Sequence, residues 1–138
     1  MSPEENKSIV RRYFEEVHNQ RKLDVMDEIF APDLAQATRG VITMMVIAFP
    51  DYLISITEQV AEGDKVATVW NISGTHLGEW MSPMGTVPPS GQRVTYTGTT
   101  TLRVTDGKIA DVIGSNHDHL GVLQQMGVVP TIAPRSGA

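Results

Sequence analysis

Side chains that can transfer protons gather near the end of the sequence, in the run Asn-His-Asp-His at residues 116–119. The segment before this run alternates like a β-strand, so every second side chain belongs to the same face. On that count Asn116 and Asp118 share one face with Gly114, and His117 points to the opposite face. This small, largely apolar face is the one we expect to line a pocket.

A carboxylate at the end of an apolar wall is suited to acid/base chemistry. Removal from water raises a carboxyl pKa towards neutrality, and such a group can remove a proton alpha to a carbonyl. We therefore predict that Asp118 is the catalytic acid/base and that Asn116 orients it or donates to a carbonyl oxygen. The alternative is that Asp118 is the N-cap of a helix beginning near His119, because Asp is a favoured cap residue.

Aromatic, methionine and histidine side chains supply a candidate binding surface for a flat apolar ligand. The alternative for the aromatic and methionine residues is core packing, and for His76 it is a hydrogen bond that holds its own loop. No phosphate loop, nucleophile elbow or helical metal-ligand pair occurs in the sequence, so we predict no metal and no cofactor. The predicted substrate-binding residues are His76, Trp70, Trp80, Tyr96, Met84, Gly114 and His119.

Composition narrows the classes of partner. The chain has 138 residues, a net charge of −5 and no cysteine, which excludes disulfides and thiolate chemistry and disfavours nucleic acid and anionic membranes. The charged N-terminus is not that of a signal peptide, and the apolar run at 41–49 is too short to span a bilayer. We expect a cytoplasmic protein that binds a small molecule.

Helical patterns fill the first third of the chain. Ser2 and Glu5 form a capping box before an apolar repeat that predicts a helix over 3–19. A short second helix over 23–30 is expected to stop at Pro32. A third helix is predicted at 40–49, either buried or facing a partner chain because nearly every side of it is apolar.

Strand patterns follow. Alternating or β-branched runs predict strands near 52–60, 66–73, 94–104 and 108–117, with a loop over 81–92 and a terminal helix over 120–126. Helices followed by antiparallel hairpins indicate an α+β fold with helices packed on one face of the sheet. We expect one domain over residues 1–130 and a flexible tail over 131–138.

Several short runs recur together, in the same order, in one known family. They are Ile29-Phe30-Ala31-Pro32-Asp33, Ala48-Phe49-Pro50-Asp51, Ala61-Glu62-Gly63-Asp64-Lys65-Val66, Ser73-Gly74-Thr75-His76-Leu77-Gly78-Glu79-Trp80, Pro89-Ser90-Gly91, Asp106-Gly107-Lys108-Ile109 and Asp118-His119-Leu120-Gly121-Val122-Leu123-Gln124-Gln125-Met126-Gly127. Over residues 5–130 the chain resembles the SnoaL-like polyketide cyclases (ester cyclases) of the nuclear transport factor 2-like superfamily.

The resemblance implies a cone-shaped fold, in which a curved antiparallel sheet wraps around the N-terminal helices and encloses a pocket. It implies an intramolecular aldol-type ring closure that uses neither metal nor cofactor. Asp118 occupies the position of the family's acid/base, at the end of the last long strand. The family is commonly dimeric, so the resemblance also implies a homodimer.

The sequence departs from the family where a pocket would be shaped. No histidine follows the Ala-Pro-Asp run, Gly114 stands where tryptophan is common, the 34–49 segment is shorter and the 81–89 loop is longer. We predict a SnoaL-like cyclase, or a related lyase or isomerase, acting on an apolar carbonyl compound. The alternatives are a non-catalytic small-molecule-binding or dimerisation module on the same fold, and an epoxide-opening hydrolase or cyclase.

Overall fold

The N-terminal helix changes its hydrogen-bonding pattern halfway along. A computed structural model describes residues 2–132, so most of the expected 131–138 tail lies outside the described residues. Helix α1 (Pro3–Arg12) begins with the predicted capping box and continues as a π-helix, η1 (Tyr13–Asn19). The expected helix over 3–19 is therefore present, with a wider second half.

Two short turns and one long helix follow. They are η2 (Leu23–Val25), α2 (Met26–Ile29) and α3 (Pro32–Ala48). The second helix ends at Ile29, before Pro32, as predicted. Pro32 itself begins α3, because a first-turn residue has no intrahelical partner for the N–H that proline lacks. Helix α3 consequently starts well before the expected Gly40.

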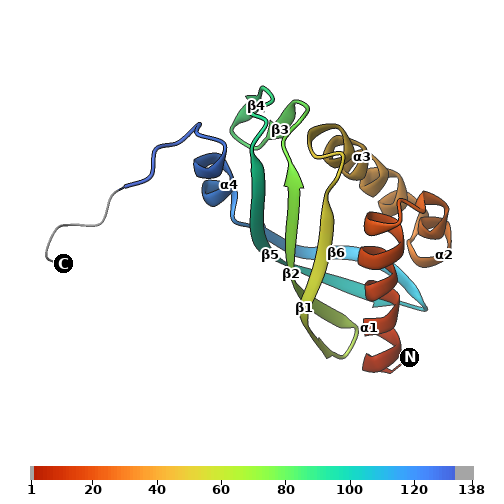
Figure 1. Ribbon diagram of the computed structural model, residues 1–138. Coiled ribbons are helices and arrows are strands. Elements are labelled where there is room, and N and C mark those ends of the chain that lie inside the picture. Colours follow the sequence, from red (N-terminus) through yellow and green to blue (C-terminus); the bar gives the residue numbers. More distant parts are fainter. Residues whose placement is uncertain (1, 133–138) are drawn as a thin grey trace, which may run out of the picture.

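The sheet is antiparallel throughout, in the spatial order β1-β2-β5-β6. The Asp106–Gly107 turn joins β5 to β6 with φ values of 50° and 78°, the left-handed conformation that a two-residue hairpin turn requires. Figure 1 shows the sheet curving behind the helices, with α1, α2 and α3 on one of its faces. The strands are β1 (Leu53–Glu62), β2 (Lys65–Thr75), β5 (Arg93–Thr105) and β6 (Lys108–His117).

The expected 81–92 loop contains a small hairpin of its own. Strands β3 (Trp80–Ser82) and β4 (Gly85–Val87) pair with each other and form a separate two-stranded sheet. The terminal helix α4 (His119–Gln125) follows β6 directly. In Figure 1 this hairpin and α4 lie at the same end of the molecule.

Strand β6 carries two bulges, and one of them changes which residues face the helices. Thr101 pairs with Gly114 and Leu102 pairs with Val112, so Ile113 is an extra residue without an opposite partner. An extra residue reverses the side-chain alternation beyond it. The expected face was therefore wrong for the end of the strand: Ser115 and His117 point inward on the same side as Val112.

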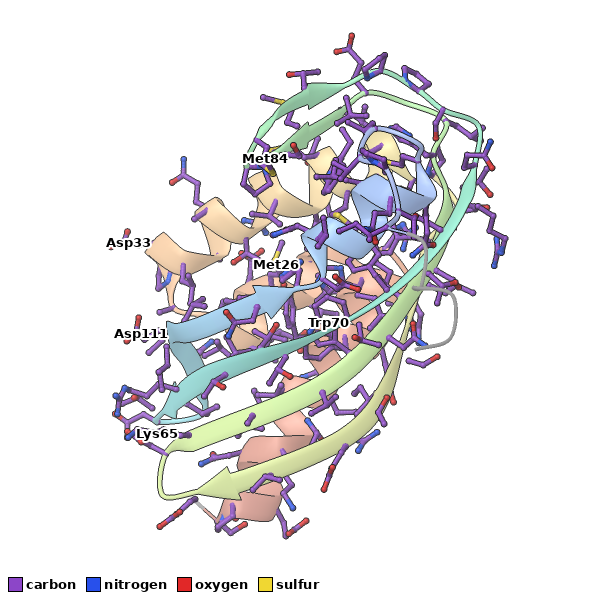
Figure 2. All side chains as sticks on the ribbon, turned by 90° about the vertical axis from the view of Figure 1, so that its left-hand side faces the viewer. Met26, Asp33, Lys65, Trp70, Met84 and Asp111 are labelled. Carbon is purple, nitrogen blue, oxygen red and sulfur yellow. The ribbon has the colours of Figure 1, made fainter. Side chains whose placement is uncertain are left out.

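The core fills the space between the concave face of the sheet and the helices. The alternation predicted for β5 is confirmed, because Val94, Tyr96 and Leu102 are buried while Thr95 and Thr97 are exposed. Figure 2 shows side chains from helices and strands meeting in this space, with Trp70 among them. None of the helices in the described part of the chain is long and apolar enough to cross a membrane.

Candidate functional site

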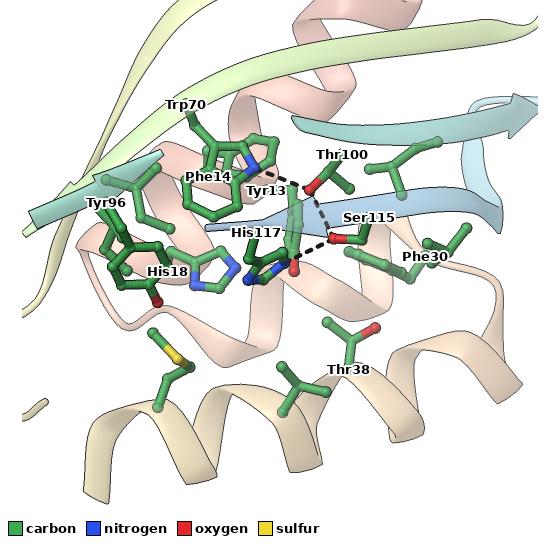
Figure 3. A pocket seen from close by; sticks show the side chains of 16 residues that line it. Tyr13, Phe14, His18, Phe30, Thr38, Trp70, Tyr96, Thr100, Ser115 and His117 are labelled. Atoms are coloured by element: carbon green, nitrogen blue, oxygen red, sulfur yellow. Dashed lines mark hydrogen bonds between the residues drawn. The ribbon is translucent and has the colours of Figure 1, made fainter. Parts of the chain in front are cut away.

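An apolar cavity of about 220 Å³ lies between the concave face of the sheet and the helices η1 and α3. Its walls come from elements distant in sequence, so the cavity exists only in the folded chain (Figure 3). Its lining residues are Tyr13, Phe14, His18, Phe30, Thr38, Val41, Met45, Ile54, Trp70, Ile72, Tyr96, Thr100, Leu102, Val112, Ser115 and His117.

The cavity opens between α3 and β6. Val41 on α3 and Val112 on β6 line it and are 54% and 43% exposed, whereas Phe14 and Trp70 on its inner wall are 3% and 4% exposed. Strand β6 is the edge strand of the sheet, so within residues 2–132 no further strand closes this side. Ser115 and His117 belong to the same strand and stand beside the opening.

A chain of hydrogen bonds runs along the sheet wall of the cavity and ends on an imidazole. The Trp70 indole N–H donates to Thr100 Oγ1 at 3.0 Å, and Thr100 Oγ1 lies 3.2 Å from Ser115 Oγ. Ser115 Oγ lies 2.9 Å from His117 Nε2. Because an indole can only donate, one end of this chain is fixed, while each hydroxyl can both donate and accept.

His117 has an environment that favours its neutral form. His117 is exposed at the opening, but the partial removal of its imidazole from water lowers the pKa of the ring, and the neighbouring His119 lowers that pKa further. The His117 ring contacts Trp70 edge to face with a centroid separation of 4.9 Å and stacks on His119 at 5.2 Å. A neutral imidazole carries one donor and one acceptor nitrogen, the two functions that proton transfer needs.

A second histidine, His18, faces the cavity from the helical side. It is 6% exposed and its Nδ1 lies 2.9 Å from the hydroxyl of Tyr52. Figure 3 shows His18 and His117 both turned towards the interior of the cavity. Among the described lining residues there is no Asp, Glu, Lys or Arg, so these two imidazoles are its strongest acid/base groups.

The two residues predicted to be catalytic lie outside the lining of the cavity. Asp118 is the N-cap of α4, and its carboxylate accepts a hydrogen bond of 2.9 Å from the Gly121 N–H. Asn116 pairs with Thr99 on the outer face of the sheet. Asp118 therefore has the capping geometry of the alternative interpretation, and the bulge at Ile113 accounts for the outward position of Asn116.

The predicted binding residues separate into two groups. Trp70 and Tyr96 line the cavity. His119 and Trp80 do not line it: their rings lie next to each other with centroids 6.1 Å apart. His119 also stacks on His117, which does line the cavity. Met84, at the tip of the β3–β4 hairpin, is 78% exposed.

His76 and Gly114 also lie away from the cavity wall. His76 is fully buried, and its Nδ1 accepts a hydrogen bond of 3.1 Å from the Ser90 N–H while contacting Ser90 Oγ at 2.8 Å. This contact ties the end of β2 to the segment before β5, the loop-holding arrangement proposed as the alternative. Gly114 pairs with Thr101 on the outer face.

Sequence reasoning missed five polar groups of the cavity, which are Tyr13, His18, Thr38, Thr100 and Ser115. Thr100 was placed on the correct face, but nothing marked its hydroxyl as a link between Trp70 and Ser115. His18 lies in the π-helix η1, so the 3.6-residue period assumed for an α-helix assigns it to the wrong face. The adjacent apolar residues Val112 and Ile113 put an apolar side chain on each face of a regular strand, which is too weak a signal to predict the bulge.

Comparison with known proteins shows which family has this architecture. The family model of the SnoaL-like polyketide cyclases matches residues 8–126, which is most of the chain. This chain belongs to the SnoaL-like polyketide cyclase family. The fold expected from the sequence, helices packed on a curved antiparallel sheet, is confirmed for this SnoaL-like protein. The family suggests a small polyketide substrate.

Solved structures of other proteins share the fold over nearly their full lengths. TsrD of Streptomyces laurentii superposes with a TM-score of 0.83 at 19% identity, covering 94% of this chain and 99% of its own. AclR of Streptomyces galilaeus, a proposed hydroxylase, gives 0.80 at 25% identity, covering 96% and 87%. IdmH of Streptomyces antibioticus, a proposed polyketide cyclase, gives 0.72 at 26%, covering 89% and 99%. Among curated proteins, none matches this sequence significantly.

Proposed function

We propose that this SnoaL-like protein is a cofactor-independent acid/base enzyme that acts on an apolar carbonyl compound inside the cavity. The reaction class is an intramolecular aldol-type ring closure, or a related lyase or isomerase step. One observation carries the proposal: the imidazole of His117, hydrogen-bonded to Ser115 at 2.9 Å, stands beside the opening of a largely apolar cavity. The family and the aromatic lining support a flat, largely apolar substrate.

The same imidazole serves both halves of an aldol closure. It first removes a proton alpha to one carbonyl and becomes an imidazolium. The enolate carbon then bonds to a second carbonyl carbon of the same molecule, and the new alkoxide takes the proton back. No atom is gained or lost, so the product is an isomer and neither oxidant nor cofactor is consumed.

The hydroxyl chain supports this exchange. With its proton on Nε2, the neutral ring donates to Ser115 Oγ and keeps the Nδ1 lone pair free for the substrate proton, and the charged ring still donates from Nε2–H. Thr100 Oγ1 accepts from the Trp70 indole in both states, so its own hydroxyl hydrogen can be donated to Ser115 Oγ. The imidazole thus keeps a hydrogen bond through both protonation states.

Asp118 is the alternative acid/base, as the family resemblance implies. For that role the carboxylate must give up the Gly121 N–H and turn towards a substrate beside His117. The reaction class is the same, and variants of the two residues separate the alternatives.

The capping geometry of Asp118 also favours a second candidate function, a small-molecule-binding protein without catalysis. Such a protein would use the cavity and its aromatic walls but would leave the ligand unchanged. Binding without turnover is its expected behaviour.

Proton exchange on a simple ketone separates the two functions. β-Tetralone, a flat bicyclic ketone, has acidic hydrogens alpha to its carbonyl, and their replacement in deuterated water is followed by proton NMR. The enzyme should accelerate the exchange above the buffer rate, in proportion to protein concentration. Saturable binding of the ketone with exchange at the buffer rate would support the non-catalytic function.

A further inference from the structure

His18 reaches the cavity because the first helix widens. The backbone N–H of Gln20 bonds to the carbonyl of Glu15, five residues back, at 3.2 Å. On a regular α-helix residues five apart are rotated by about 140° from each other, so Tyr13 and His18 would face in different directions. In η1 their rings meet edge to face, with centroids 4.6 Å apart, and both line the cavity.

Tyr52 determines which nitrogen of His18 carries the proton. The Tyr52 side chain is fully buried, and its hydroxyl has no hydrogen-bond partner among the described residues other than His18 Nδ1, at 2.9 Å. Burial raises the pKa of Tyr52 to about 12, so the phenol keeps its proton near neutral pH. The phenol then donates to Nδ1, which leaves the hydrogen of the neutral imidazole on Nε2.

Arg21 contacts both His18 and Tyr52 and fixes their relative position. Its guanidinium lies 3.8 Å from the centroid of the Tyr52 ring and donates to the backbone carbonyls of His18 and Tyr52. Burial lowers the pKa of His18 to about 3, and the charge of Arg21 adds to this effect. The imidazole consequently stays neutral over the whole range in which the protein would work.

The Nε2–H of His18 has no hydrogen-bond partner among the described residues. Its surroundings are apolar: the ring stacks on Phe14 with centroids 5.9 Å apart and meets the edge of Tyr13. The Nε2–H therefore faces the cavity, where an oxygen brought by a ligand can accept it in surroundings of low polarity.

We infer that His18, oriented by Tyr52, donates a hydrogen bond to a carbonyl oxygen of the ligand. The ligands that fit the cavity are then flat, uncharged compounds with a ketone or enol oxygen. The inference rests on the proposed function and names the group that holds the substrate oxygen while His117 moves the proton. An anionic ligand is disfavoured, because no Lys or Arg occurs among the described lining residues. Each His18 bond to an oxygen would strengthen as charge develops on the enolate.

Two ligands of the same shape test this assignment. β-Tetralone carries the oxygen and tetralin, its hydrocarbon counterpart, lacks it; calorimetry gives the dissociation constant of each for the full-length protein. In His18→Phe we expect ketone binding to weaken about tenfold, while tetralin binding changes less than about twofold. His18→Gln, which keeps an N–H near the position of Nε2, should retain most of the preference, and Tyr52→Phe should lose part of it.

The outcomes are distinguishable. If both ligands bind the wild type and His18→Phe weakens neither, or weakens both equally, the assignment of His18 is wrong and the proposed function stands. If neither ligand binds the wild type, the cavity is not a ligand site and both proposals fail. Nitrogen-15 spectra of the histidine side chains give an independent readout, because the assignment requires the Nε2–H form of His18 near neutral pH. The Nδ1–H form would overturn it even if a variant failed to fold.

Discussion

Ser115 Oγ and His117 Nε2 lie 2.9 Å apart on the same wall of the cavity, although regular alternation had placed His117 on the face opposite the pocket. The bulge at Ile113 accounts for this position, because it turns the end of β6 so that residues 115 and 117 point inward. The proton-transfer chemistry proposed for the cavity depends on this change of face.

Removing the Ser115 hydroxyl should weaken catalysis more than binding. In Ser115→Ala the imidazole loses its partner in both protonation states, so we expect exchange on β-tetralone to slow about tenfold with ketone affinity little changed. Asn116→Ala is the matched control, since Asn116 follows directly but points outward beside Thr99. Equal losses in the two variants, or a larger loss in Asn116→Ala, would contradict the assigned face.

The pH dependence of exchange should follow His117. Burial and His119 lower the pKa of this imidazole below its ordinary value, so the base form is present at neutral pH and is lost only as the solution becomes acidic. We expect the exchange rate to be level above neutral pH and to fall with acid, with a midpoint below that of a free imidazole. His119→Asn removes one cause of the shift and should move the midpoint upward. A midpoint that stays fixed in this variant would contradict the described contact.

Acid should destabilise the fold through His18. Its pKa is about 3 in the folded chain and near 6.5 when unfolded, so between these values the unfolded chain binds a proton that the folded chain does not. The free energy of unfolding should therefore fall as pH drops through this window, by up to roughly 5 kcal/mol from His18 alone.

His18→Gln removes this titration, while burial raises the pKa of both Tyr13 and Tyr52, so these two phenols keep their protons throughout the window. Urea denaturation at several pH values in both proteins gives the comparison. Parallel pH curves for wild type and His18→Gln would show that the imidazole is not buried in its neutral form.

Blocking the opening should stop ligand entry without affecting the fold. Val41 lines the cavity and is 54% exposed, whereas Ile47, on the same helix and 56% exposed, does not line it. Val41→Trp should reduce the association rate of β-tetralone strongly, and Ile47→Trp should leave it unchanged. Stopped-flow binding measures both rates; equal rates would place the opening elsewhere.

The sequence predicted most of the architecture because its signals were local. The Ser2–Glu5 capping box, the Asp106-Gly107 turn and the alternation of residues 94–104 each depend on neighbours a few residues away. The fold followed from the order of these elements and from the family resemblance.

The site was harder to predict because its positions depend on backbone irregularities. A single bulge at Ile113 exchanged the two faces of the last strand, and a π-helix moved His18 beside Tyr13. Neither irregularity leaves a clear pattern in the sequence. The hydrogen bonds from Tyr52 to His18 and from Trp70 to Thr100 join residues that are 34 and 30 positions apart in the chain. Trp70 and Tyr96 were found because ordinary strand alternation is enough to place them.

The capping role of Asp118 has a consequence for stability. Asp118→Ala should lower the free energy of unfolding by about 1 kcal/mol, because the Gly121 N–H loses its acceptor at the start of α4. Asp118→Asn should cost less, since asparagine is an equally good cap residue. Urea denaturation compares the two, and a loss in Asp118→Asn as large as in Asp118→Ala would argue against the cap.

The most direct test of the proposed chemistry compares His117→Ala with Asp118→Asn in the β-tetralone exchange assay. We expect His117→Ala to reduce the protein-catalysed rate at least about a hundredfold, the usual scale for loss of a general acid/base, and Asp118→Asn to retain it within about twofold. Both variants should still bind the ketone. Full activity in His117→Ala together with its loss in Asp118→Asn would contradict the account and make the helix-capping carboxylate the catalytic group.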